Sequence, residues 1–188
     1  MKLVKCSIPL VLSAIVAAYP PSSEESQHID KVGIEFILKE EGCSLCAYSD
    51  VIGKSTIGVG ATRDSSGKAI RDNLTLTEED VARLFIRDLK DVEYCLDSSL
   101  QGQLMPQSVY NAAGSLVFNI GCRGVTVNKN SSFTRLKQSA EKEDWPRFCS
   151  HITDYKYVGR KMNVAIMERR MREKTLCLSG LEESTDVD

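Results

Sequence analysis

The chain has 188 residues, of which 42% are hydrophobic and 27% charged, and its formal net charge is −2. These values are typical of a soluble globular protein with one domain and small appendages. The net charge argues neither for nor against an anionic partner, but a nucleic-acid-binding module is not expected, because there is no recognised motif and few exposed-looking aromatic residues lie beside the bases.

The N-terminal residues are organised like an export signal. Lys2 and Lys5 precede a weakly apolar stretch, residues 6–19, that contains Pro9. A spanning helix needs about 20 apolar residues, and this stretch is shorter. We therefore expect either a cleaved signal or an uncleaved, marginal membrane anchor, with the bulk of the chain exported. A polar, proline-containing linker follows over residues 20–27.

The cysteines favour an oxidising compartment, because seven are many for a cytosolic enzyme of this size. Their odd number leaves at least one free or exchanging thiol. Only His28 and His151 could supply imidazole, and no C-x₂-C pair is repeated downstream. We expect neither a metal site nor a cofactor.

A helix followed by a small β-element is predicted next. Helical periodicity begins at Asp30, which can cap the helix, and Gly42 ends it, so that Glu41 lies at its C-terminal end. Residues 46–62 alternate in polarity and carry three glycines, which is typical of a β-hairpin or small sheet.

The remainder of the chain is predicted to be helical. A capping-box-like Thr77-Glu-Glu-Asp80 precedes a long amphipathic helix, and Pro106 precedes a more apolar helix through Asn119. Shorter helices are predicted over 131–140, 142–152 and 160–178. Seven bases between Lys156 and Lys174 could face an anionic polymer or form a solvated helix face. The predicted fold class is α+β, with a small β lobe, a helical lobe and a cleft between them.

Two carboxylic acids near the hairpin suggest glycosidase chemistry. Glu41, at a helix end, and Asp50, on a neighbouring strand, could project into one cleft. Cleavage of a glycosidic bond needs a proton donor and, on the other face, a nucleophile or base. A carboxyl shielded from water keeps its proton, so Glu41 suits the acid, while Asp50 and the hydroxyl of Thr56 suit holding a water. The spacing alone is weak evidence, because such pairs occur by chance.

The surrounding sequence resembles the phage T4-type lysozymes, glycoside hydrolase family 24. Three separated blocks occur in family order: EEGCSLCAYSDVIGKSTIGVGAT (40–62), SLVFNIGCRG (115–124) and RRMREKTLCLSG (169–180). The resemblance implies a lysozyme-like fold and a catalytic triad of Glu41, Asp50 and Thr56. It also implies an inverting muramidase that cuts the β-1,4 bond between N-acetylmuramic acid and N-acetylglucosamine in peptidoglycan. Tyr48, Gly58 and Asn119 are the implied substrate contacts.

Within the family, the chain is most similar to the signal-anchor-release (SAR) endolysins of phages that infect Gram-negative hosts. The likeness implies export by the host Sec machinery and an inactive form held in the inner membrane through residues 6–19, facing the periplasm. Release would give a soluble, monomeric periplasmic enzyme that lyses the host. The implied parts are residues 1–27 (anchor and linker), 28–181 (catalytic domain) and 182–188 (acidic tail).

Cysteines next to the acid suggest a redox control of activity. A Cys43–Cys46 bridge would pin the turn after Glu41 and disturb its geometry, and a displacement of about 1 Å can cost about two orders of magnitude in rate. Cys6, once out of the membrane, could attack Cys43 or Cys46 and reopen the site by exchange. The alternative is a permanent Cys43–Cys46 bridge with Cys6 an incidental thiol. Family topology implies structural bridges Cys95–Cys122 and Cys149–Cys177.

Two other functions remain open at this point. A lytic transglycosylase would use one catalytic glutamate and leave anhydro-muramic ends. A non-catalytic, secreted wall-binding protein would keep the fold without the activity, although intact Glu41, Asp50 and Thr56 argue against it.

Overall fold

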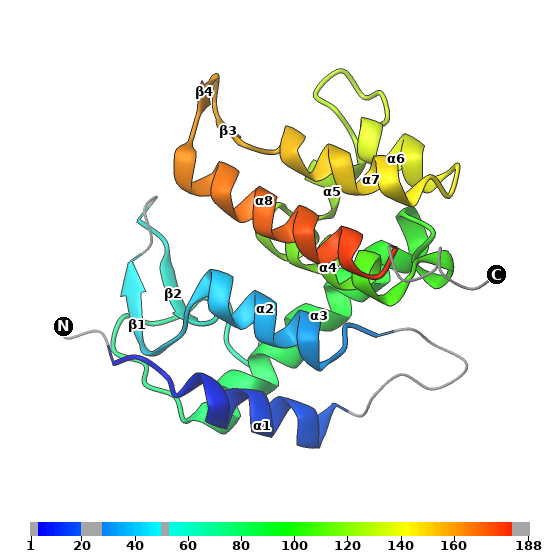
Figure 1. The fold of residues 1–188 in the computed structure, drawn as a ribbon. Coiled ribbons are helices and arrows are strands. Elements are labelled where there is room, and N and C mark those ends of the chain that lie inside the picture. The colour runs from blue at the N-terminus through cyan, green and yellow to red at the C-terminus, as the bar shows by residue number, and fades with distance from the viewer. Residues whose placement is uncertain (1–3, 20–27, 50–52, 182–188) are drawn as a thin grey trace. The chain divides into compact units, whose positions relative to one another are not determined.

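The computed structural model describes residues 4–19, 28–49 and 53–181. The chain divides into two compact units, the first drawn from Met1–Pro21 and Ile34–Lys90 and the second from Ser22–Gly33 and Asp91–Asp188 (Figure 1). Helices predominate and the sheets are two-stranded, so the predicted α+β class is confirmed.

The first unit begins with helix α1 (Ile8–Ala18), formed by the apolar N-terminal stretch. Val11 and Ile15 are fully buried, whereas Leu10 and Val16 on the same helix are exposed. Within the described ranges, no helix has both the length and the apolar character needed to cross a membrane.

Helix α2 (Lys31–Glu41) has the bounds that its capping residues predict. The Asp30 carboxylate accepts hydrogen bonds from the backbone N–H groups of Val32 (2.8 Å) and Gly33 (3.0 Å), which satisfies two donors of the first turn. Gly42 follows with φ of 70°, a left-handed conformation that suits glycine and ends the helix. Glu41 is therefore the last residue of α2, as predicted.

The predicted hairpin is formed by β1 (Ser44–Ser49) and β2 (Ser55–Gly58), which pair antiparallel. The other edge of β1 bonds to the segment around Leu74–Leu76: Ala47 N–H donates to the carbonyl of Leu74 (3.0 Å), and Leu76 N–H donates to that of Leu45 (2.8 Å). A small apolar cluster supports this lobe, formed by Ala47, Ile57, Ala61, Ile70 and Leu84.

Helix α3 (Glu78–Ser99) starts at the predicted capping box. Asp80 N–H donates to the Thr77 hydroxyl (3.2 Å), and Thr77 N–H donates to the Asp80 carboxylate (3.1 Å). The bond from the Arg83 guanidinium and those from Thr77 lower the pKa of Asp80. A short 3₁₀ turn, η1 (Gly102–Leu104), follows α3.

The second unit is built on α4 (Gln107–Ile120) and α8 (Val164–Ser179), which pack against each other. Between them the chain forms α5 (Cys122–Thr126), α6 (Arg135–Ala140), α7 (Trp145–His151) and the 3₁₀ turn η2 (Ile152–Asp154). Helices α6 and α7 lie within the predicted ranges 131–140 and 142–152, whereas α5 was not predicted. Gly121 (φ of 79°) ends α4 as expected.

The prediction of a helix over 160–178 is wrong at its start. β3 (Tyr157–Val158) and β4 (Lys161–Met162) form a small exposed hairpin there. Helix α8 begins only after Asn163, whose side-chain oxygen accepts a hydrogen bond from Ile166 N–H (3.0 Å).

Two bases of the C-terminal run are buried, which corrects the expectation that this run faces solvent or an anionic polymer. Arg169 is 8% exposed and Arg170 is fully buried. Both pair with the buried carboxylate of Glu173, at 3.0 and 2.5 Å, and the Ser115 hydroxyl of α4 donates to it at 2.8 Å. Burial raises the pKa of Glu173, and the two guanidinium groups act in the opposite direction.

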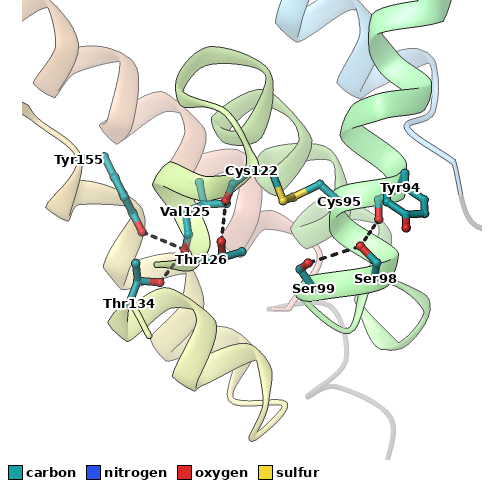
Figure 2. The surroundings of a disulfide bond; sticks show 9 residues. All are labelled: Tyr94, Cys95, Ser98, Ser99, Cys122, Val125, Thr126, Thr134 and Tyr155. Carbon is teal, nitrogen blue, oxygen red and sulfur yellow. Dashed lines mark hydrogen bonds between the residues drawn. A yellow bond between two sulfur atoms is a disulfide. The ribbon is translucent and has the colours of Figure 1, made fainter. Parts of the chain in front are cut away.

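Two disulfides lie within the second unit, and they join the pairs implied by the family resemblance. Cys95–Cys122 links α3 to α5, beside the Val125 carbonyl that accepts hydrogen bonds from Thr134 (2.5 Å) and Tyr155 (3.3 Å) (Figure 2). Cys149–Cys177 links α7 to α8.

Candidate active site

Glu41 lines a pocket of the first unit. The pocket has a volume of about 350 Å³, and its wall includes Tyr48 of β1 and the turn that follows α2. Glu41 is half-buried at the C-terminal end of α2, where Gly42 turns the chain directly into β1. The helix end and the strand therefore place a carboxyl and an aromatic ring in one cavity, an arrangement that suits binding a sugar next to a proton donor.

The hairpin places Thr56 directly opposite Tyr48 in the strand register. The Thr56 side chain is 3% exposed, and its hydroxyl donates a hydrogen bond to the Lys54 carbonyl (3.1 Å). Because the hydroxyl proton is committed to this carbonyl, the Thr56 oxygen can act only as an acceptor toward a further partner.

The remaining predicted site residues are distributed as follows. Asp50 lies outside the described residues. Gly58 pairs with Ser44 and has φ of 63°, and a Cβ at this position would lie 3.5 Å from Val81, so the hairpin itself favours glycine here. Asn119 belongs to the second unit, where its side-chain oxygen accepts a hydrogen bond from the Arg170 guanidinium.

A disulfide joins Cys6 to Cys43, which lies two residues after Glu41, and both cysteines line the pocket. Cys46 is the free cysteine among the described residues; it is half-buried, with its sulfur 3.8 Å from the Thr75 hydroxyl. A permanent Cys43–Cys46 bridge with Cys6 as an incidental thiol is therefore wrong. Cys6–Cys43 is one of the two exchange products expected from attack by Cys6.

Two pocket residues from the N-terminal segment were not predicted as site residues from the sequence. Lys5 and Ile8, which flank Cys6 in the N-terminal segment, line the same pocket as Glu41. The sequence feature that could have identified them is the expected attack of Cys6 on Cys43, since a Cys6–Cys43 bond brings the neighbours of Cys6 close to the turn after α2.

A second pocket of about 350 Å³ lies on α6 and α7 and is basic, with Arg135, Lys142, Arg147 and His151 in its wall. Its described lining contains no carboxyl group, so it lacks the proton donor that glycosidic cleavage needs. Among the residues that the structure describes, no cluster of three or more His, Cys, Asp or Glu side chains could hold a metal ion.

Comparisons with known proteins agree with the sequence blocks and the fold. The phage lysozyme family profile matches residues 38–173. The SAR-endolysin of Haemophilus phage HP1 is 28% identical over 94% of this chain and 95% of its own length. The endolysin of Salmonella phage P22 is 34% identical over 80% of this chain and 98% of its own length.

The fold is similar to that of solved endolysins. The crystal structure of the active form of P1 phage endolysin Lyz superposes with a TM-score of 0.81 at 23% identity, covering 95% of this chain and 97% of that one. The lysozyme-like fold and the resemblance to phage lysozymes and SAR endolysins are thus confirmed. With its family profile spanning residues 38–173, the chain belongs to the phage lysozyme family and is a lysozyme hydrolase.

Proposed function

We propose that the chain degrades peptidoglycan as a muramidase, with Glu41 as the general acid and Asp50 and Thr56 holding the attacking water. The observation that carries this proposal is the position of Glu41 at the end of α2, in a sugar-sized pocket beside the β1–β2 hairpin. The hairpin carries Thr56 on β2, and the family profile spans all three residues.

The reaction needs a proton delivered to the leaving oxygen and a water delivered to the opposite face of the sugar. Glu41 supplies the proton to the glycosidic oxygen between N-acetylmuramic acid and N-acetylglucosamine. The water attacks the anomeric carbon and gives its proton to Asp50, so the configuration inverts. For this geometry we expect the two carboxyl groups to be about 6.5–9.5 Å apart.

Thr56 has a defined part in this scheme. Its proton is engaged by the Lys54 carbonyl, so its oxygen accepts one hydrogen bond from the water. Asp50 accepts the other, and the water then directs a lone pair at the sugar. This arrangement orients the nucleophile without consuming the threonine.

The test is the Glu41→Gln variant, with Glu35→Gln on the same helix as the matched control. Glu35 forms an exposed ion pair with Lys39 (2.7 Å), so its loss should change stability little. We expect Glu41→Gln to abolish wall hydrolysis while the circular dichroism spectrum and melting temperature stay close to wild type. Retained turnover would exclude Glu41 as the proton donor, and anhydro-muramic products would identify a lytic transglycosylase instead.

We infer further that residues 6–19 tether the chain to the host inner membrane before release, on the periplasmic side, after export by the Sec machinery. The name SAR-endolysin of the HP1 relative, which aligns with 94% of this chain, supports this inference. The exposed Leu10 and Val16 of α1 are apolar surface that a bilayer would cover.

Thiol exchange would couple release to activity. In the tethered form, a Cys43–Cys46 bridge would hold the turn after Glu41. The Cys6 thiolate would then attack the Cys43 sulfur, form the Cys6–Cys43 bond and expel Cys46 as a thiolate, with no net oxidation. The pairing of Cys6 with Cys43 and the free thiol of Cys46 support this sequence of bonds.

The test of the coupling compares lysis by wild type and Cys6→Ser before and after membrane depolarisation. We expect wild type to lyse cells after depolarisation and Cys6→Ser to remain inactive, and a mild reductant should restore the variant. Equal lysis by both proteins throughout would remove the thiol exchange and leave the muramidase proposal intact.

A further inference from the structure

The N-terminal segment forms part of the wall of the pocket that contains Glu41. Lys5, Cys6 and Ile8 come from this segment, and Glu41, Cys43 and Tyr48 come from the end of α2 and from β1. All of these residues belong to the first unit.

Backbone pairing fixes Lys5 in register with the strand. Leu45 N–H donates to the Val4 carbonyl (2.7 Å), and Cys6 N–H donates to the Cys43 carbonyl (3.3 Å), so the two bonds flank the Lys5–Ser44 pair. Opposite residues of an antiparallel pair present their side chains on the same face. Cys6, the residue after Lys5, is bonded to Cys43, so the disulfide holds the N-terminal segment against the turn after α2.

The charges of this wall point to an anionic ligand. Of the described residues that line the pocket, Lys5 alone carries a positive charge and Glu41 alone carries a carboxyl group. Lys5 is exposed, and none of the salt bridges within the described ranges engages it. Its ammonium group is therefore available to a carboxylate that enters with the substrate.

We propose that Lys5 is a substrate-binding residue that binds a carboxylate of the peptide stem on the glycan, while Ile8 and Tyr48 contact the sugar. This inference rests on the proposed muramidase function. The scissile bond joins a sugar that carries this stem to one that does not, so a proton donor at the bond lies close to the stem. Lys5 would then make the enzyme selective for glycans that carry carboxylates, and the segment that tethers the chain would also complete its substrate site.

The experiment measures kcat/KM for soluble peptidoglycan strands and for the same strands after their carboxylates are converted to neutral methylamides. The proteins are full-length and contain the Cys6–Cys43 bond: wild type, Lys5→Gln, Lys5→Arg and Lys90→Gln. Lys90 is an exposed lysine of α3 in the same unit and does not line this pocket, so its variant is the matched control.

We expect Lys5→Gln to lower kcat/KM on intact strands by about fivefold at low ionic strength, mainly through KM, as loss of a solvent-exposed ion pair predicts. On methylamidated strands Lys5→Gln should match wild type. Lys5→Arg should retain wild-type values on both substrates, and Lys90→Gln should behave as wild type.

Two results would overturn the inference. If Lys5→Gln equals Lys90→Gln on intact strands, or loses as much activity on methylamidated strands as on intact ones, Lys5 does not bind a substrate carboxylate. In both cases wild type would still cleave the strands, and the muramidase proposal would stand. If wild type releases no reducing ends from either preparation, the proposed function fails and this inference fails with it.

Discussion

Glu41 and Thr56 reach the site through short-range features of the chain. Glu41 ends a helix because Gly42 adopts a left-handed conformation, and Thr56 lies on a strand whose register sets it opposite Tyr48. Each side chain has a role that depends on one local contact or position, which makes the site testable one residue at a time.

The Thr56 hydroxyl can be tested by removing it without changing the volume of the side chain. We expect Thr56→Val to lower kcat by about 100-fold with little change in KM, because the water would lose one of its two acceptors. Thr56→Ser, which keeps the hydroxyl, should retain most of the activity. Release of reducing ends from peptidoglycan is the measurement.

The neighbouring Ser55→Ala variant is the control for Thr56→Val. The Ser55 hydroxyl is buried and has no hydrogen-bond partner among the residues that the structure describes, so Ser55→Ala deletes a hydroxyl from the same strand. We expect Ser55→Ala to keep wild-type kcat. Equal losses in the two variants would show that the strand tolerates neither change and that Thr56 has no special part in the reaction.

Among the elements, the helices were predictable where a capping residue marks their ends. Asp30, Thr77 and Gly121 each stand at the predicted boundary. The side chains of Asp30 and Thr77 accept hydrogen bonds from backbone N–H groups that a helix start exposes. Gly121 ends α4 because its positive φ angle turns the chain out of the helix. The β3–β4 hairpin was missed because its four residues are exposed and carry no alternation of polarity.

The capping box of α3 makes a prediction about stability and pH. Asp80→Ala should lower the free energy of unfolding by about 1 kcal/mol at pH 7, because the Thr77 N–H loses its acceptor. The folded-state pKa of Asp80 is lowered, so the contribution is present above the unfolded pKa of about 3.9 and is lost as pH falls through the folded value. The difference from wild type should therefore shrink in acid.

Thermal unfolding at pH 7 and pH 3 measures this effect. Glu79→Ala is the control, because Glu79 is an exposed acid in the same first turn. A difference between Asp80→Ala and wild type that stays constant between the two pH values would contradict the assignment of the cap to the ionised carboxylate.

The ion-pair cluster between α4 and α8 could not be predicted from sequence. Arg169 and Arg170 lie four and three residues before Glu173, respectively, a spacing also found on solvated helices. Only packing against α4, which supplies Ser115 and Asn119 as partners, shows that the three charges are buried. The family's Arg-rich block therefore has a structural role in this chain.

Removing the central carboxylate should destabilise the second unit strongly. Glu173→Gln removes the carboxylate that both buried guanidinium groups contact, and we expect a loss of about 3–5 kcal/mol in the free energy of unfolding. Glu168→Gln, at an exposed position of the same helix, should cost little. Urea unfolding of the two variants is the measurement, and similar midpoints would contradict the cluster's importance.

At the scale of the whole molecule, the disulfides are distributed unequally between the two units. Cys6–Cys43 lies in the first unit, where both cysteines are half-buried. Cys46 provides a free thiol on β1, the strand that follows the turn at Gly42 and Cys43. The second unit holds Cys95–Cys122 and Cys149–Cys177, and both sulfurs of the latter belong to fully buried residues. The family resemblance implied the two bridges of the second unit, whereas sequence reasoning left the partner of Cys6 open.

This distribution predicts the order in which a mild reductant opens the three bonds. Exchange requires a thiolate to approach one of the sulfurs, so access to the sulfurs controls the rate in the folded protein. Cys6 and Cys43 should be alkylated first, Cys95 and Cys122 next, and Cys149 and Cys177 last, as followed by mass spectrometry of timed samples. In denaturant, where burial is lost, the three pairs should react at similar rates. If Cys149–Cys177 opened as fast as Cys6–Cys43 in the folded protein, burial would not protect the second unit, and the bond beside Glu41 would not be the one suited to exchange.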